Sequence, residues 1–183
     1  VGYDAFEFHR GKAECKKALL EECGLEQKPQ KPVVGIVSRL DYQKGLDTAV
    51  NVIERYKGRV LFTVLGAGDP KLEKAYQALA RKNPSCVAYR GRLDEELAHK
   101  IYAGADLFLM PSRFEPCGLS QLIAMKYGTL PVVSRVGGLA DTVKGYPASD
   151  ATGFFIDPLT ENGICDALDT ALKAYADKKQ WFK

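Results

Sequence analysis

Short apolar runs recur along this sequence, and each is followed by a polar loop and then by a longer stretch with helical periodicity. Runs of this kind, with valine, isoleucine and leucine at consecutive positions, are typical of strands that are buried on both faces of a sheet. The predicted strands cover residues 33–37, 60–65, 86–90, 106–110, 130–133 and 153–156.

Between these runs, apolar residues spaced three and four apart predict amphipathic helices. Strands that alternate with helices imply a parallel sheet, covered on both faces and joined by right-handed crossovers. The sequence therefore predicts a Rossmann-like, doubly wound α/β domain, in which residues 144–152, which lack any period, form an excursion loop. The predicted helices cover residues 12–23, 46–56, 70–82, 94–103, 119–127, a short segment from 139, and 161–178.

Length and composition narrow the class of protein. The chain has 183 residues, 46% hydrophobic and 27% charged, as in a soluble globular protein with one substantial domain. Its 26 lysines and arginines are scattered among 23 acidic residues, and the net charge is only +3. We therefore expect no nucleic-acid partner held by bulk electrostatics, while a local basic site stays compatible with the composition.

The cysteines and the lengths of the apolar runs exclude further classes of protein. Five cysteines without a C-x-x-C pair indicate neither a disulfide framework nor a zinc site, and they favour a reducing compartment. No apolar run approaches the roughly 18 residues of a membrane span, and no signal-peptide pattern opens the chain, so we expect no membrane partner. The sequence begins at Val1 without an initiating methionine and ends in a charged stretch. We therefore expect a piece of a longer protein.

The loops that follow the strands are the predicted site of chemistry. In a doubly wound sheet, these loops line one crevice at the carboxyl ends of the strands. The loop after the fourth strand leads into a helix, whose first N–H groups would face an anion in that crevice. The loops expected to converge are 38–45, 66–69, 91–93, 111–118 and 134–138, and they contribute Arg39, Lys44, Arg92, Arg113, Arg135 and Glu115.

Two of these loops have alternative interpretations. Arg39 and Lys44 suit a diphosphate, because arginine grips two oxygens and lysine adds a compact charge, yet two solvated loop cations are equally consistent with the spacing. Gly66 and Gly68 resemble the start of a dinucleotide fingerprint, but Lys71 stands where the third glycine belongs. A tight turn is therefore the better interpretation of the two glycines, and NAD binding loses support.

Several single residues favour an ordinary structural role. Glu115 alone would be a solvated or helix-start charge, and Cys117 has no activating histidine near it in sequence. His99 is expected to be packed or at the surface, and the pair Gly137 and Gly138 to form a turn. The aromatic residues expected in the core are Phe108, Phe114, Tyr127, Phe154 and Phe155.

Four motifs taken together carry a family resemblance. The chain resembles the bacterial and plant glycogen and starch synthases over nearly its whole length, with the motifs in the same order. The motifs are Ser38-Arg39-Leu40 with Gln43-Lys44-Gly45-Leu46, Pro111-Ser112-Arg113-Phe114-Glu115-Pro116-Cys117-Gly118-Leu119, Tyr127-Gly128-Thr129-Leu130-Pro131, and Gly137-Gly138-Leu139-Ala140-Asp141-Thr142-Val143.

The resemblance implies a retaining glucosyltransferase with two Rossmann-like domains, the GT-B arrangement. Such enzymes transfer glucose from a nucleotide sugar, usually ADP-glucose, to the non-reducing end of an α-1,4-glucan. Residues 1–183 would be the single C-terminal domain, which binds the nucleotide sugar, while the absent N-terminal domain supplies most of the acceptor surface. The isolated chain is then expected to be inactive, and the location to be cytoplasmic, or plastidic in a plant.

The resemblance also implies roles for individual residues. Arg39 and Lys44 would bind the diphosphate and stabilise the charge on departing ADP, with no metal ion and no cofactor besides the donor substrate ADP-glucose. Glu115 would hydrogen-bond the glucose hydroxyls without a covalent role. The remaining substrate-binding residues are Cys117, Gly118 and Leu119 through backbone N–H groups, Ser120 at the distal phosphate, and Leu93, where many relatives place a tyrosine against the adenine.

Two other functions are consistent with the sequence. The chain is alternatively a non-catalytic glucan-binding module, because half of a two-domain cleft cannot complete the reaction. It is alternatively the domain of a related transferase that uses a UDP- or GDP-sugar.

Overall fold

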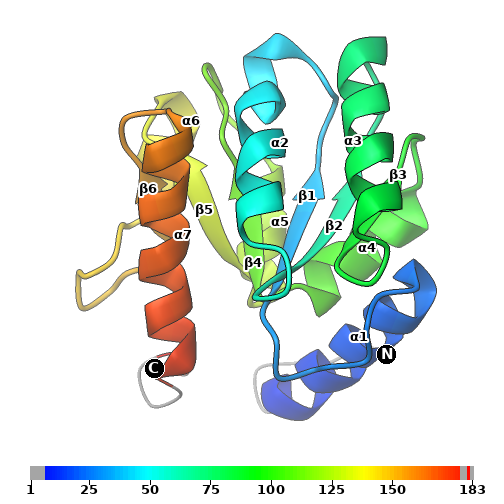
Figure 1. Cartoon of the computed structure of the whole chain (residues 1–183). Coiled ribbons are helices and arrows are strands. Elements are labelled where there is room, and N and C mark those ends of the chain that lie inside the picture. Colours follow the sequence, from blue (N-terminus) through cyan, green and yellow to red (C-terminus); the bar gives the residue numbers. More distant parts are fainter. Residues whose placement is uncertain (1–6, 178–180, 182–183) are drawn as a thin grey trace.

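The computed structural model describes residues 7–177 and 181. Six strands form one sheet in the order β3-β2-β1-β4-β5-β6, and all neighbouring strands are parallel (Figure 1). The Rossmann-like, doubly wound fold is therefore confirmed. The strands are β1 (Val33–Val37), β2 (Leu61–Leu65), β3 (Val87–Arg90), β4 (Leu107–Met110), β5 (Leu130–Ser134) and β6 (Phe154–Ile156).

Helices cover both faces of this sheet. In Figure 1, α2, α3 and α7 lie in front of the strands, and their apolar residues form one of the two core clusters with the sheet. The other cluster lies on the opposite face, among α1, α4, α5 and α6. The helices are α1 (Phe8–Cys23), the 3-10 helix η1 (Tyr42–Lys44), α2 (Leu46–Arg55), α3 (Pro70–Lys82), α4 (Glu95–Gly104), α5 (Ser120–Lys126), α6 (Gly137–Thr142) and α7 (Glu161–Ala176).

The predicted elements agree closely with these bounds, and residues 144–152 contain no helix or strand. Two local differences have identifiable causes. Helix α1 begins at Phe8, earlier than predicted, because Gly11 and polar neighbours obscure the period of its first turn. Helix η1 was not predicted, since three residues are too few for periodicity. The predicted end of the last helix at Lys178 lies outside the described residues.

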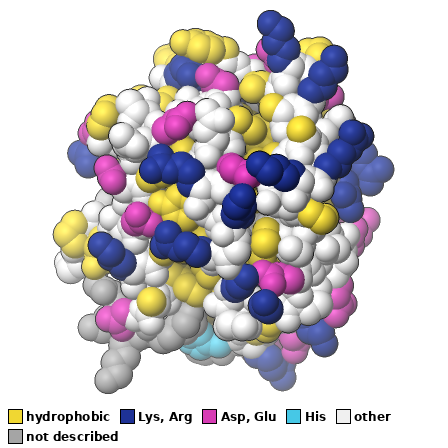
Figure 2. All heavy atoms as spheres, in the orientation of Figure 1, with side chains coloured by type: hydrophobic (Ala, Val, Ile, Leu, Met, Phe, Trp, Pro, Cys, Tyr) yellow, Lys and Arg dark blue, Asp and Glu magenta, His cyan; other side chains and the backbone are white. Residues whose placement is uncertain are grey.

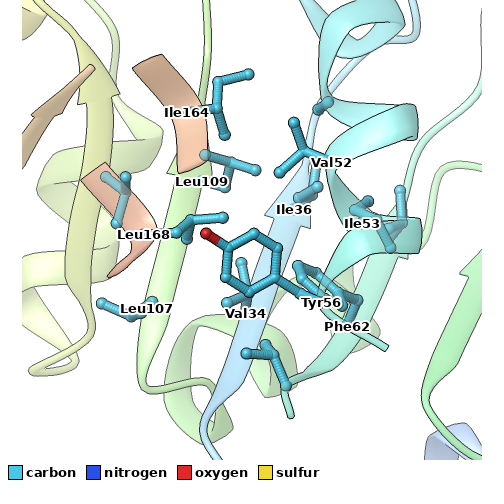
Figure 3. Close-up of a cluster of buried hydrophobic side chains, with 14 of the residues drawn as sticks. Val34, Ile36, Val52, Ile53, Tyr56, Phe62, Leu107, Leu109, Ile164 and Leu168 are labelled. Carbon is cyan, nitrogen blue, oxygen red and sulfur yellow. The ribbon is translucent and has the colours of Figure 1, made fainter. Parts of the chain in front are cut away.

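Side-chain hydrogen bonds stabilise two helix starts and one contact in the core. Asp69 and Asp94 cap α3 and α4 by accepting hydrogen bonds from the N–H groups of Lys71 and Leu97. Figure 3 shows Tyr56 reaching from the end of α2 into the cluster that contains Leu168 of α7. Its hydroxyl donates to the carbonyl oxygen of Cys165 at 3.0 Å. Helices α2 and α7 are thus joined by apolar packing and by a buried hydrogen bond.

The prediction for the core aromatics is wrong for one residue. Phe108 and Phe154 are buried, and Tyr127 and Phe155 are partly buried against the second core cluster. Phe114, however, leaves 61% of its surface exposed. The N–H of Arg113 and the carbonyl oxygen of Phe114 are both hydrogen-bonded to Gln43 of the loop after β1, so the backbone here faces that loop while the phenyl ring is in solvent.

The two glycines after β2, Gly66 and Gly68, allow the backbone after β2 to pack closely against the backbone after β1. Ser38 N donates to Leu65 O at 3.0 Å, and Leu40 N donates to Ala67 O at 2.9 Å, so the pairing of β1 and β2 continues beyond both strands. A Cβ atom on Gly66 would lie 1.8 Å from the carbonyl oxygen of Ser38. A Cβ atom on Gly68 would lie 2.3 Å from the carbonyl oxygen of Leu40, and the two contacts explain the Gly-x-Gly sequence without a dinucleotide.

Candidate functional site

A cavity lies where the strand order reverses. β1 and β4 are neighbours in the sheet, but the chain leaves them in opposite directions, toward β2 and toward β5. Open α/β sheets bind ligands outside the carboxyl ends of strands at such a switch point. The cavity has a volume of about 210 Å³. It is lined by Val37, Ser38, Arg39, Lys44, Leu46, Leu109, Met110, Pro111, Ser112 and Ser120.

Lys44, which lines this cavity, forms an ion pair with Glu115, which lies beside it and is not itself a lining residue. The Nζ of Lys44 lies 2.6 Å from Oε2 of Glu115, and their side chains are only 18% and 8% exposed. The hydroxyl of Ser112 donates to the same carboxylate oxygen at 3.2 Å. The other oxygen, Oε1, receives no hydrogen bond from the described residues. Glu115 is therefore a buried carboxylate that is held on one side and can accept hydrogen bonds on the other.

The backbone around Lys44 explains its position. The Asp41 carboxylate caps η1 by accepting a hydrogen bond from Lys44 N at 3.1 Å. Gly45 follows with φ +65°, and a Cβ atom there would lie 1.8 Å from the carbonyl oxygen of Pro111. Only glycine permits both this conformation and this approach. The loop after β1 thus packs directly on the loop after β4, which brings Lys44 to Glu115.

Arg39 contributes the second cation of the cavity. Its side chain is 69% exposed and lies 3.2 Å from the Asp41 carboxylate, so it stands at the open rim, whereas Lys44 lies deeper. The predicted pair of cations therefore does line one cavity. A planar guanidinium and a compact ammonium on the same wall can contact different oxygens of one polyanion.

The other predicted cations are engaged outside this cavity, so the prediction that all the loops contribute to it was too broad. Arg92 lies 2.7 Å from Asp94, and Arg113 is paired with Asp47. Arg135 is 3.5 Å from Asp157, with its guanidinium 4.4 Å from the ring centre of Phe155. On the face that Figure 2 shows, basic and acidic side chains are likewise interspersed.

The turn before α5 has its carbonyl groups tied to one side by a buried glutamine side chain. Cys117 and Leu119 are exposed, and Ser120 lines the cavity. The buried Gln121 side chain donates from Nε2 to the carbonyl oxygens of Cys117, at 3.2 Å, and Gly118, at 3.0 Å. In a trans peptide the N–H points opposite to the C=O, so the N–H groups of Gly118 and Leu119 are directed away from Gln121.

Sequence reasoning missed two supporting residues, Ser112 and Gln121. Ser112 lies three residues before Glu115, and Gln121 lies four residues after Cys117, so both spacings are present in the sequence. The signal is weak, however, because isolated serine and glutamine residues are common in loops and helices. The loop 134–138 also contributes support, since Gly138 N donates to the carbonyl oxygen of Glu115 at 3.0 Å.

Other predicted positions lie apart from the cavity. Leu93 is 92% exposed and does not line it. His99 is at the surface, with Nδ1 3.1 Å from the Tyr127 hydroxyl. Within residues 7–177 and 181, no cluster of three histidine, cysteine or acidic side chains is arranged to hold a metal ion.

None of the helices in the described part of the chain is both long enough and apolar enough to span a membrane.

Comparison with known proteins gives consistent matches. Residues 23–183 match the family described as glycosyl transferases group 1. The chain is 59% identical over 181 residues to the glycogen synthase of Elusimicrobium minutum (strain Pei191), which covers 98% of this chain. It is 47% identical over 173 residues to the glycogen synthase of Anaeromyxobacter dehalogenans (strain 2CP-1), which covers 93%. The resemblance to this group of synthases is thereby confirmed.

A solved structure agrees with these matches. This chain matches the catalytic domain of starch synthase IV from Arabidopsis thaliana, bound to ADP and acarbose, with a TM-score of 0.92 and 34% sequence identity. The match covers 100% of this chain and 39% of the starch synthase chain. The chain spans 38% and 36% of the lengths of the two glycogen synthases.

Proposed function

Because this chain belongs to the group 1 glycosyl transferases, we propose that it is the nucleotide-sugar-binding domain of a glycogen or starch synthase. In this proposal the enzyme transfers glucose from ADP-glucose to the non-reducing end of an α-1,4-glucan, with retention of configuration. The observation that carries the proposal is the cavity at the switch point, where Arg39 and Lys44 lie on one wall and Glu115 lies beside Lys44.

The two cations would bind the diphosphate of the donor. As the bond between the glucose carbon and the phosphate oxygen breaks, negative charge accumulates on the departing ADP. Lys44, and Arg39 at the rim, would stabilise that charge more in the transition state than in the bound donor. Leu46 and Leu109 line the same cavity, and their apolar surface limits the screening of this attraction by water. We propose no metal ion and no other cofactor for this step.

Glu115 would orient the glucose. Its carboxylate is fixed by Lys44 and Ser112 through Oε2, and Oε1 is left to accept hydrogen bonds from sugar hydroxyls. The N–H groups of Gly118 and Leu119, and the backbone of Cys117, would add donors to the sugar, with Ser120 at the distal phosphate. A carboxylate that is already paired with an ammonium group suits recognition of hydroxyls, and we assign it no covalent role.

ADP is the nucleotide that we favour. Starch synthase IV, which shares this fold at 34% identity, is bound to ADP in its structure, and the two similar bacterial proteins are glycogen synthases. The base would lie near Leu93, whose exposed side chain offers an apolar contact to an adenine face in place of an aromatic ring. The contact would be weaker than stacking on tyrosine.

The glucan acceptor would be held mainly by the remainder of the enzyme. The similar glycogen synthases are much longer than this chain, so we assign the acceptor surface to an additional domain and place this one in the C-terminal half of a GT-B enzyme. In this proposal the chain alone carries one wall of the active site and transfers no glucose. The enzyme would act in the cytoplasm, or in the plastid of a plant.

Transfer of labelled glucose tests this function. The full-length protein should elongate glycogen with ADP-glucose as donor, and more slowly with UDP-glucose. Preference for a UDP- or GDP-sugar would identify a different transferase of the same fold. Retention of the chain on glycogen in co-sedimentation, without any nucleotide binding, would instead support a non-catalytic glucan-binding module.

A further inference from the structure

The two residues at the centre of the site are carried by different loops, and one arginine joins those loops. Arg113, two residues before Glu115, reaches across to η1 and the first turn of α2. Its guanidinium makes a bidentate contact with the Asp47 carboxylate, NH1 to Oδ1 at 2.7 Å and NH2 to Oδ2 at 2.8 Å. The same NH1 donates to the carbonyl oxygen of Tyr42 at 2.7 Å. Arg113 therefore holds residues on both sides of Lys44.

Further contacts leave this guanidinium little freedom. Its carbon lies 3.9 Å from the ring centre of Tyr42, and NH2 is 3.3 Å from the hydroxyl of Thr48. The plane of the guanidinium is thus fixed by a carboxylate at its edge and by an aromatic ring over its face. Lysine has neither the fork nor the flat surface needed to make both contacts at once.

The backbones of the two loops are joined at the same place. Arg113 N donates to the carbonyl oxygen of Gln43 at 2.8 Å, and the Gln43 side chain donates to the carbonyl oxygen of Phe114 at 3.0 Å. Gln43 immediately precedes Lys44, and Arg113 lies two residues before Glu115. The side-chain and backbone contacts together form a frame around the ion pair.

We propose that Arg113 is a positioning residue for the transfer reaction: through Asp47 and Tyr42 it sets the place of Lys44 relative to Glu115. The proposal rests on the proposed function, because it gives Lys44 the task of contacting the donor. Arg113 itself does not line the cavity, so it acts on the donor only through Lys44. Misplacing a substrate-positioning group by about 1 Å costs on the order of 100-fold in rate, which is the scale of effect expected here.

Electrostatics supports this geometry. The Arg113 guanidinium, mainly through its hydrogen bonds, lowers the pKa of the Asp47 carboxyl, and Asp47 in turn raises the pKa of Arg113. Both groups therefore stay ionised over the working range of pH, and the frame stays closed.

A double-mutant cycle in the full-length protein tests the proposal. Arg113→Lys and Arg113→Ala should lower kcat/KM for ADP-glucose by about 10- to 100-fold. In the Lys44→Ala background the same substitutions should cost less than about twofold, because two changes that act through one group are not additive. Arg135→Ala is the matched control. It removes an arginine that also has a carboxylate and an aromatic neighbour, Asp157 and Phe155, but lies outside the cavity.

The outcomes are distinguishable. An equal loss from Arg113→Ala with and without Lys44, or an equal loss from Arg135→Ala, would overturn the positioning role while leaving the proposed function standing. Unchanged transfer in Lys44→Ala alone would overturn both. Thermal unfolding of each variant identifies any that fails to fold. If Arg113→Ala fails to fold, Arg113→Lys and Asp47→Asn replace it in the double-mutant cycle with Lys44→Ala, and the same coupling is expected.

Discussion

Lys44 and Glu115 are separated by 71 positions in the sequence, yet the lysine Nζ lies 2.6 Å from the glutamate Oε2. The contact joins the loop after β1 to the loop after β4 at the switch point of the sheet. An ammonium group has three protons and needs only one for this contact, so Lys44 can donate to a phosphate oxygen while it keeps Glu115. The ion pair is thus compatible with a donor that touches both residues.

Replacement of Glu115 by glutamine should separate nucleotide binding from sugar recognition. The substitution removes a negative charge next to Lys44 while nearly preserving volume. We expect ADP to bind as tightly as before, or up to about tenfold more tightly, since one charge-assisted hydrogen bond to Lys44 is released. Glucose transfer by the full-length protein should fall by at least about 100-fold, because the sugar loses its carboxylate acceptor.

Titration calorimetry with ADP and a labelled-glucose transfer assay measure the two effects of Glu115→Gln. Glu161→Gln is a suitable control, because Glu161 lies at the start of α7 and contacts Asn51, away from the cavity. A Glu115→Gln variant that lost ADP binding would contradict the account, since it would show that the carboxylate supports the nucleotide rather than the sugar.

Replacement of Gly45 by alanine should damage stability and binding together. The left-handed backbone at this position costs alanine about 1–2 kcal/mol in free energy of unfolding. A Cβ there would also lie 1.8 Å from the Pro111 carbonyl oxygen, so the two loops would separate and Lys44 would move from Glu115. Urea denaturation and ADP titration should both show a loss.

Gly58 supplies the matched control for Gly45. It has φ +79°, but nothing lies within 4 Å of a Cβ atom placed there. Gly58→Ala should therefore show the backbone cost alone and leave ADP affinity unchanged. Equal stability losses in the two variants, with ADP affinity intact in both, would disprove the close packing of the loops after β1 and β4.

Lys12 should make stability depend on pH. Its Nζ donates to the carbonyl oxygens of Tyr102 and Tyr127, and burial lowers its pKa from 10.5 to about 7, against the opposing effect of Asp106. Above pH 7 the unfolded chain therefore binds more protons than the folded chain. The free energy of unfolding should rise between pH 7 and 9, with a contribution from Lys12 of up to about 1.4 kcal/mol per pH unit.

Comparison with a variant isolates the contribution of Lys12. Denaturation of Lys12→Met should lack this rise, whereas Lys17→Met, at an exposed position of the same helix, should keep it. The difference between each variant and the parent chain removes the titration of cysteines and tyrosines. A Lys12→Met protein with the same pH dependence as the parent would show that Lys12 is not shifted.

Much of the fold was predictable because burial leaves a local signal. The strands are apolar at consecutive positions since both faces of the sheet are covered, and their bounds follow from that pattern. The strand order is set by contacts between distant segments, so the sequence alone did not show that β1 and β4 are neighbours. For the same reason, the spacing of Arg39 and Lys44 in the sequence does not distinguish two ligands of a diphosphate from two solvated cations.

The arginines illustrate the limit of motif reasoning. Arg39, Arg113 and Arg135 all follow strands and carry the same charge, but only Arg39 lines the cavity. Arg113 is diverted by Asp47, which lies 2.7 Å away and 66 positions earlier in the sequence. Phe114 was misassigned to the core because its apolar side chain follows a buried strand, whereas its loop turns the ring outward. The spatial neighbours of loop residues, such as Asp47 for Arg113, are known only once the loops are placed in the structure.

Titration of ADP into this chain and into its Lys44→Ala variant measures whether Lys44 binds the nucleotide diphosphate. We expect the parent chain to bind ADP and Lys44→Ala to bind it about 10- to 100-fold more weakly, as for the loss of one charge-assisted contact of about 1.5–3 kcal/mol. Arg39→Ala should show a smaller loss that diminishes with salt, because Arg39 is exposed, and Arg135→Ala should bind normally. ADP binding of equal strength in the parent and in Lys44→Ala would contradict the account.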